Sequence, residues 1–181
     1  MKEISLNVLD ISENSVKAKA TLVEILIDED DNTLKLTIKD NGIGMKREIL
    51  EGVINPFYTT RTTRRVGLGL PFLKLASEQT GGSMTIESKH IDEHPCEHGT
   101  VVKAVFYKNH LDYTPLGDIV STVITLIQGH PEIDFYFKHK TGEKTVELDT
   151  RQLKLVLEDV PLNSYEVLCW IKEYLLEQYI N

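Results

Sequence analysis

The sequence predicts a mixed α/β fold at residues 1–110, followed by a smaller α/β extension at residues 115–181. Three observations predict it. Residues 34–39 alternate apolar and polar side chains, as a half-buried strand does. Ile4, Val8, Ile11 and Ser15 recur at the spacing of one helix face, which we expect to point to the core. The composition changes near residues 111–115, and a second group of helix and strand patterns follows.

Length and charge limit the class of protein. The chain has 181 residues, enough for one compact domain and an appendage. Its formal net charge of -8 disfavours nucleic-acid partners, because phosphate contacts need clustered cations. No apolar run approaches the ~20 residues of a membrane span. No signal-peptide pattern precedes Lys2 and Glu3. Cys96 and Cys169 lie far apart and form no paired motif. We therefore expect a reduced, cytoplasmic protein without nucleic-acid or membrane partners.

The first element is a helix expected over residues 4–18. Asp10, Asn14 and Lys17 fall at i, i+4 and i+7, so they share a face that differs from the apolar one. Such a stripe could bind a metal and phosphates. Asn14 offers a neutral oxygen to Mg²⁺, and Lys17 offers a positive charge to a phosphate. Asp10 could orient or deprotonate an attacking hydroxyl. The alternative is a solvated helix face with an ion pair between Glu13 and Lys17, and the helix alone favours this alternative.

A hairpin of two strands follows, at residues 21–27 and 34–39, and Asp40 closes it. The next residues read Asn-Gly-Ile-Gly-Met. Gly42 and Gly44 permit positive φ and let a flat ring approach the backbone. The carboxylate of Asp40 could accept a hydrogen bond from the exocyclic N6 amine of adenine. Taken alone, this pattern is also that of a common turn.

A short helix at residues 46–52 leads into a loop that begins at Asn55. The loop carries three arginines and two glycines, followed by a helix over residues 70–80 that ends at Gly81-Gly82. Glycines at the start of a helix leave free N–H groups directed at an anion, and the arginines Arg61, Arg64 and Arg65 add cationic donors. This combination favours phosphate binding over a tight loop with exposed arginines.

Two further strands are expected at residues 83–88 and 100–107. The loop between them contains His90, His94, Cys96 and His98, side chains that could bind zinc. Their spacing matches no metal motif, and acidic residues and a proline lie between them. An ordinary solvated loop is the favoured interpretation.

The C-terminal segment reads as helix, hairpin and two helices. Asp118 is expected to cap the first helix, Asp149 or Thr150 the second and Ser164 the third, with the hairpin strands at 135–137 and 145–148. The segment has no glycine-rich loop and no paired catalytic groups. We expect it to fold against the N-terminal region or a partner, with a partner-docking role, and we expect Trp170 to be largely buried.

Taken together, five stretches resemble motifs of one family. Asp10–Lys17 resembles the N box of the GHKL ATPase superfamily, and Asp40–Gly44 resembles its G1 box. Asn55–Arg61 resembles its F box and lid, Gly67–Leu70 resembles its G2 box, and Gly99-Thr100 resembles its closing Gly-Thr. That superfamily includes gyrase, Hsp90, histidine kinases and MutL, and the likeness is greatest to the histidine-kinase catalytic domain. It covers residues 4–107. It implies the Bergerat-type ATP-binding fold, an α/β sandwich with a mixed sheet on one side and helices on the other.

The resemblance also implies roles for single residues. Asn14 would coordinate Mg²⁺, Asp40 would hold adenine N6 and Thr100 would assist there. Lys17 and Arg61 would contact the phosphates, and Asp10 occupies the position of a general base. The glycine turns would shape the nucleotide pocket, namely Gly42, Gly44, Gly67 and Gly69, with Leu68 between the last two.

Some features depart from the kinase pattern. Arg65 and Val66 stand where the G2 box usually has an earlier glycine, and the strand and dimerisation helix that usually precede the N box are not found before residue 4. None of the six histidines lies in a phosphoacceptor context, so autophosphorylation on histidine in cis is not expected.

The expected function is therefore a stand-alone Mg-ATP-binding domain. It would act as an ATPase or kinase on a partner protein in trans, or use its nucleotide state, ATP or ADP, to control that partner. The alternatives are a regulatory module that binds nucleotide without turnover, and an adaptor whose C-terminal segment docks the partner. Residues 55–66 are expected to form a mobile lid that orders over the γ-phosphate.

Overall fold

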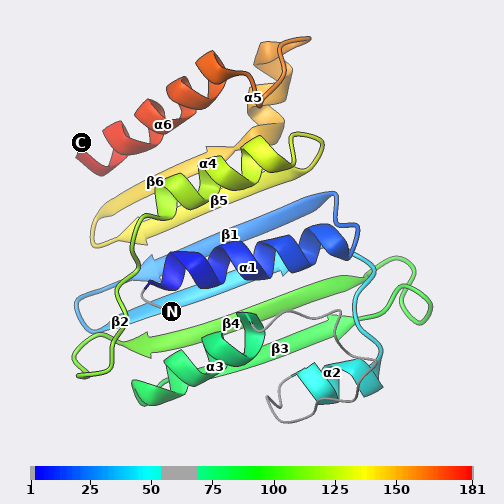
Figure 1. The fold of residues 1–181 in the computed structure, drawn as a ribbon, viewed down its shortest axis with the longest axis vertical. Coiled ribbons are helices and arrows are strands. Elements are labelled where there is room, and N and C mark those ends of the chain that lie inside the picture. Colours follow the sequence, from blue (N-terminus) through cyan, green and yellow to red (C-terminus); the bar gives the residue numbers. More distant parts are fainter. Residues whose placement is uncertain (1–2, 54–68, 181) are drawn as a thin grey trace.

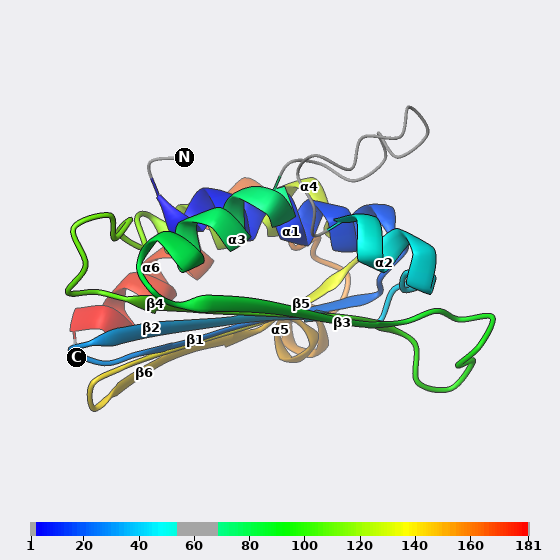
Figure 2. The same cartoon turned by 90° about the horizontal axis from the view of Figure 1, so that it is seen from below.

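The computed structural model describes residues 3–53 and 69–180 and contains one mixed sheet of six strands, in the order β3-β4-β2-β1-β5-β6. Figures 1 and 2 show α1, α3 and α4 side by side on one face of this sheet. The predicted α/β sandwich is thus confirmed. The strands are β1 (Leu22–Glu29), β2 (Thr33–Asp40), β3 (Ser83–Lys89), β4 (Gly99–Tyr107), β5 (Asp134–Thr141) and β6 (Lys144–Asp149). The helices are α1 (Ile4–Lys17), α2 (Arg47–Val53), α3 (Gly69–Gln79), α4 (Ile119–Gly129), α5 (Thr150–Leu157) and α6 (Tyr165–Ile180).

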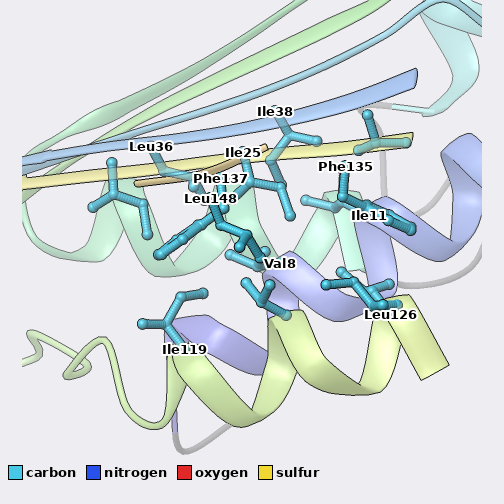
Figure 3. Close-up of a cluster of buried hydrophobic side chains, with 14 of the residues drawn as sticks. Val8, Ile11, Ile25, Leu36, Ile38, Ile119, Leu126, Phe135, Phe137 and Leu148 are labelled. Carbon is cyan, nitrogen blue, oxygen red and sulfur yellow. The ribbon is translucent and has the colours of Figure 1, made fainter. Parts of the chain in front are cut away.

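The core lies between the sheet and these helices. Alternate residues of β1 and β2 are buried, because successive side chains of a strand point to opposite faces. Ile25 of β1 lies opposite Ile38 of β2, and Val8 and Ile11 of α1 meet this surface from the helix layer (Figure 3). Helix α1 therefore rests on the centre of the sheet, with its C-terminal end near the end of β2.

The C-terminal segment continues the same sheet. Strand β5 pairs in parallel with β1, so that Phe135 lies beside Val23 and Phe137 beside Ile25, and β6 pairs antiparallel with β5. Helix α4 makes the crossover and packs beside α1. The expectation that this segment folds against the N-terminal region is confirmed, whereas the division of the chain into two domains stays a prediction.

The caps of the C-terminal helices only partly follow the sequence. Asp118 accepts a hydrogen bond from Ser121 N before α4, and Asp149 accepts one from Arg151 N before α5, as predicted. Ser164 directly precedes α6, but its buried hydroxyl has no hydrogen-bond partner among the described residues. The predicted cap bond at Ser164 is therefore not formed.

The expected burial of Trp170 is wrong. Its side chain is 50% exposed and stacks on Tyr174, with ring centroids 5.1 Å apart. The buried face of α6 consists of Val167, Leu168, Ile171 and Leu175. Trp170 immediately precedes Ile171, and one residue is a rotation of about 100° around an α-helix, so its ring points away from the core.

Within residues 3–53 and 69–180, no helix combines the length and the apolar character that crossing a bilayer requires.

A buried polar network joins α6 to the sheet. His139 of β5 is only 4% exposed and contacts the Tyr179 hydroxyl through Nδ1 at 2.7 Å and Glu29 Oε2 through Nε2 at 3.2 Å. Glu29 also accepts a hydrogen bond from Lys108 Nζ at 2.7 Å. Because a carboxylate only accepts, Nε2 of His139 carries the proton, and Nδ1 accepts from Tyr179. The neutral imidazole therefore satisfies both of its partners.

This network makes stability depend on pH. Burial lowers the pKa of His139 below its ordinary value of 6.5, an effect that outweighs the opposite influence of the Glu29 carboxylate. As pH falls, the unfolded chain binds the proton first. The contribution of neutral His139 is thus fully present above pH 6.5 and is lost as pH falls from there toward the lowered pKa.

We expect the free energy of unfolding in urea to fall between about pH 7.5 and about pH 5.5, and to fall less in the His139→Gln variant, which cannot titrate. His110→Gln is the matched control, since His110 is 45% exposed in its side chain. Identical pH dependence in wild type and His139→Gln would contradict this account.

Candidate functional site

A cavity of about 470 Å³ lies at the end of β2 and brings together residues from distant parts of the sequence. Its polar lining includes Asn14 and Lys17 from α1, Asp40 from β2 and Thr100 from β4. Five of the predicted site residues line it: these four and Gly44. Among the described residues, the lining consists of Ile11, Asn14, Ser15, Lys17, Ala18, Ile38, Asp40, Ile43, Gly44, Met45, Ile49, Leu70, Thr100 and Val102. Most of the surface is apolar, which suits a flat ring with polar groups at its edge.

Asp40 is the most constrained polar residue of the cavity. It is 9% exposed, and its Oδ2 accepts a hydrogen bond from Ser15 Oγ at 2.7 Å. Its Oδ1 accepts from Gly42 N at 2.9 Å and from Thr100 N at 3.3 Å. A carboxylate offers about four lone-pair positions, and three are used here. No donor from residues 3–53 or 69–180 uses the remaining one, on Oδ2, which can accept a hydrogen bond from a ligand.

The glycines of the turn after Asp40 are required for different reasons. Gly44 has φ +70, and a Cβ there would collide with the carbonyl group of Lys89. Gly42 does not have positive φ, contrary to expectation. It is glycine because a Cβ would lie 2.7 Å from the carbonyl oxygen of Ala18. The turn is thus pressed between the end of α1 and the loop after β3.

Hydrogen bonds hold the turn on both sides. Ile43 N donates to Ala18 O at 2.8 Å, and Ile91 N donates to Ile43 O at 2.9 Å. His98 Nδ1 lies 2.7 Å from Gly42 O; since a carbonyl only accepts, this nitrogen carries the proton. The side chains that support the cavity therefore come partly from the loop between β3 and β4.

Ser88 connects the turn to β4. Its hydroxyl accepts from Met45 N at 2.7 Å and lies 2.9 Å from the Thr100 hydroxyl. The residue beside Asp40 on β4 is Thr100 itself, by strand register. Thr100 thus contributes both its backbone N–H and its hydroxyl to this end of the cavity.

The polar stripe of α1 is divided between two environments. Asn14 and Lys17 line the cavity, whereas Asp10 is exposed and does not. Asp10 lies against the start of α3, where a Cβ at Gly69 would approach Asp10 Cβ to 2.9 Å. The alternative ion pair between Glu13 and Lys17 is wrong, because Glu13 Oε1 contacts His130 Nε2 at 2.8 Å instead.

Asn14 fits a magnesium ligand. Its Nδ2 is buried and has no hydrogen-bond partner among the described residues. The two ends of an amide are interchangeable by rotation, so the same position can present Oδ1. A neutral oxygen suits Mg²⁺, which proteins commonly hold through one or two side chains and the phosphates of a nucleotide. The side chain therefore has an unmet polar group where such an ion would need a ligand.

The loop with His90, His94, Cys96 and His98 lies wholly in the described part of the chain. Within that part, no group of three or more His, Cys, Asp or Glu side chains is placed to hold a metal ion. His98 contacts Gly42 O, and Cys96 is exposed.

Several predicted residues lie outside the described ranges. They are the segment 55–66, which contains Arg61, Arg64 and Arg65, and the two residues Gly67 and Leu68. Gly69, the last glycine of that motif, is the first residue of α3.

Sequence reasoning missed three supporting side chains: Ser15, Ser88 and His98. For Ser15 a signal existed. It falls on the buried stripe of α1 with Ile4, Val8 and Ile11, and a buried hydroxyl needs a partner, which the carboxylate at the end of β2 supplies. No local pattern marks His98 as the partner of a carbonyl 56 residues away in sequence.

Comparison with protein families finds one model that matches residues 2–110, described as "Histidine kinase-, DNA gyrase B-, and HSP90-like ATPase". Similar proteins include Sporulation kinase A of Bacillus subtilis, 32% identical over 108 residues, which cover 60% of this chain and 16% of that protein. Sensor histidine kinase YvrG of the same organism is 30% identical over 101 residues, covering 52% of this chain and 16% of the kinase. The chain thus spans less than a fifth of these two relatives.

Solved structures extend the likeness beyond residue 110. The ADP complex of the Aquifex aeolicus MutL ATPase domain matches with a TM-score of 0.53 and 17% identity, over 87% of this chain and 70% of that chain. The N-terminal domain of a DNA repair protein matches with a TM-score of 0.55 and 16% identity, over 82% of this chain and 53% of that chain. Residues 1–110 alone could not supply such coverage of 181 residues, so the shared fold includes part of the C-terminal segment.

The close contacts of the turn lead to a stability prediction. Gly44→Ala should lower the free energy of unfolding by about 1–2 kcal/mol or more, since a Cβ disfavours positive φ by about that amount and here also meets the Lys89 carbonyl. Gly129→Ala is the control, because a Cβ there meets nothing within 4 Å. Urea denaturation of the two variants measures the difference, and equal stability would refute the account of the turn.

Proposed function

Because the chain belongs to the histidine kinase-, DNA gyrase B- and HSP90-like ATPase family, whose domains bind ATP, we propose that it uses Mg-ATP to control a partner protein. The motif resemblance seen in the sequence is confirmed by the family match. Within the family the domain is of the histidine-kinase-like type, as its sequence relatives are sensor and sporulation kinases. The proposal goes further, to a domain that phosphorylates a partner in trans or regulates it through its nucleotide state.

One observation carries the proposal. A single cavity collects five of the predicted nucleotide-binding residues from three separate stretches of sequence. Asn14 and Lys17 lie on one helix, Asp40 and Gly44 at the end of one strand, and Thr100 on the neighbouring strand. Its volume of about 470 Å³ falls in the range of pockets that bind small ligands.

Adenine would occupy the apolar end of the cavity. The remaining lone pair of Asp40 Oδ2 would accept from the N6 amine, while Thr100 lies beside it to contact a ring nitrogen directly or through water. Apolar side chains such as Ile38, Met45 and Val102 would contact the faces of the ring. The three internal donors to Asp40 keep its carboxylate in one orientation before the ligand arrives, which reduces the entropy lost on binding.

The phosphates would extend along the polar stripe of α1. Asn14 would supply one oxygen to Mg²⁺, and the ion when bound would neutralise the phosphate charge. Lys17 would contact a phosphate as a point charge. Asp10 of α1, which lies against the start of α3, would orient or deprotonate an attacking hydroxyl. Three predictions from the sequence stay predictions: Arg61 contacts the phosphates, Gly67 and Leu68 belong to the nucleotide pocket, and residues 55–66 form a lid.

A regulator without turnover is the second candidate. Asp10 is shorter than the glutamate that many ATP-hydrolysing relatives carry, and it lies outside the cavity lining. This position favours nucleotide binding over catalysis. Release of labelled phosphate from ATP, measured with the chain alone and with added lysate, separates the two candidates.

The adenine assignment predicts a base preference. Wild type should bind ADP more tightly than inosine diphosphate, which replaces the N6 amine with an acceptor oxygen that the Asp40 carboxylate repels. Losing a hydrogen bond to a charged group costs about 1.5–3 kcal/mol, or roughly 10- to 150-fold in affinity. Asp40→Asn should lose most of this preference. Calorimetry with both nucleotides measures it.

Ser15→Ala is the matched control for that experiment. It removes one internal donor to Asp40 but leaves the carboxylate in place, so the preference for ADP should remain. An Asp40→Asn variant that still discriminates the two bases as wild type does would rule out the assignment.

The magnesium assignment predicts a metal dependence. ATP affinity should rise when Mg²⁺ is added to wild type, and Asn14→Ala should remove most of that rise because the protein ligand is lost. Asn14→Asp keeps an oxygen at the same position and should retain a dependence on Mg²⁺. Titrations with Mg²⁺ or with a chelator give the comparison; equal ATP affinity of wild type under both conditions would exclude a metal at this site.

A further inference from the structure

Helix α6 is apolar on more than its buried face. Val167, Leu168, Ile171 and Leu175 pack on the core, but large apolar side chains also cover its outer surface. Tyr165 is 78% exposed, Ile180 77% and Leu176 42%. Exposed large apolar side chains that gather on one surface commonly mark a protein–protein contact. The outer surface of α6 therefore has the character of an interface.

The outer surface is ordered into three rows. With a rotation of about 100° per residue, Tyr165, Cys169, Leu176 and Ile180 fall within about 60° of one another and form an apolar row. Glu166, Glu173 and Glu177 fall in the next ~40° and form an acidic row. Trp170 and Tyr174, stacked at 5.1 Å between ring centroids, form an aromatic row beyond it. The acidic row thus runs between two apolar ones.

The acidic row has no internal counter-charge. Among the described residues, none of Glu166, Glu173 and Glu177 takes part in an ion pair. Lys172, the one cation of α6, lies on the other flank of the apolar row, about 100° or more from each glutamate. Glu173 and Glu177 are four residues apart, a spacing at which like charges destabilise a helix. A cation supplied from outside would relieve this repulsion.

We propose that the outer face of α6 is a docking site for a basic amphipathic helix of a partner protein. Apolar residues of that helix would cover the row from Tyr165 to Ile180, and its Lys or Arg residues would pair with the three glutamates. Arg could also stack on the Trp170–Tyr174 pair, since a guanidinium binds well on an aromatic face. The inference deepens the proposed function, on which it rests only for the existence of a partner protein.

The charges argue against an antiparallel pair formed by α6 of this chain and α6 of a second copy. In an antiparallel helix pair related by a two-fold axis, equivalent flanks of the two helices face each other. The three glutamates of one copy would then face the same three glutamates of the other. Like-charge contacts across an interface are unfavourable, so the acidic row selects a partner of opposite sign.

The chain contains one tryptophan, and its position on this surface provides a direct probe. The test uses the full 181-residue chain and a synthetic amphipathic helical peptide with a leucine stripe and lysines at i, i+4, i+7 and i+11 beside it. The matched peptide has glutamates in place of the lysines. The lysine peptide should shift the emission of Trp170 to shorter wavelength in a saturable manner, and the glutamate peptide should not.

Two double variants separate this site from general attraction to an acidic protein. Glu173→Lys/Glu177→Lys should weaken the lysine peptide by about tenfold or more. Glu87→Lys/Glu93→Lys changes the net charge equally at exposed residues of β3 and the loop after it, at the edge of the sheet opposite to β6 and α6, and should leave the affinity nearly unchanged. Both variants should bind ADP as wild type does, since neither touches the cavity.

Three results would overturn the proposal: no emission shift with the lysine peptide, equal weakening by the two double variants, or a dimer of the chain alone that Leu176→Arg dissociates. The last result would identify a second copy as the occupant. Failure of the chain to bind ADP would instead count against the proposed function and leave the peptide result valid.

Discussion

The Asp40 carboxylate fixes the relative positions of three parts of the chain. Ser15 attaches it to α1, Gly42 N attaches it to its own turn, and Thr100 N attaches it to β4. Each of these bonds involves a charged acceptor at a site with little exposure, where hydrogen bonds are strong and an unpaired partner is costly. The shape of the cavity depends on this one side chain, because all three parts contribute to its wall.

The sheet connects this cavity to the surface of α6. Strand β2, which ends at Asp40, pairs with β1, and β1 pairs in turn with β5 and through it with β6, on which α6 packs. Figure 1 shows α2 and α6 near opposite edges of the molecule, with α1 and α4 between them. A partner held on α6 would therefore have to extend across the helix layer to reach the phosphate site proposed at Asn14 and Lys17.

Local pattern was enough to predict most of the secondary structure, because strands with one buried face alternate and helices with one buried face repeat every 3.6 residues. The motifs also predicted that Asn14, Lys17, Asp40 and Thr100 share a cavity, whereas Asp10 of the same helix motif lies outside its lining. Long-range features were not accessible. Nothing near residue 135 in the sequence indicates that Phe135 pairs with Val23, or that His98 contacts Gly42. The stripe of Leu168, Ile171 and Leu175 does indicate the buried side of α6, but Trp170 lies about 100° from Ile171 and is therefore off that stripe.

The parallel pairing of β1 with β5 has a consequence for the chain as it is made. Strand β1 is complete by Glu29, but its neighbour begins only at Asp134. At a synthesis rate of 5–20 residues per second, the intervening hundred or so residues take roughly 5–20 s to appear. During that interval one edge of β1 is an open row of backbone donors and acceptors on an apolar strand, the kind of edge that recruits other chains. Nascent and C-terminally shortened forms therefore share one hazard, aggregation through β1, and both need that edge covered by another molecule.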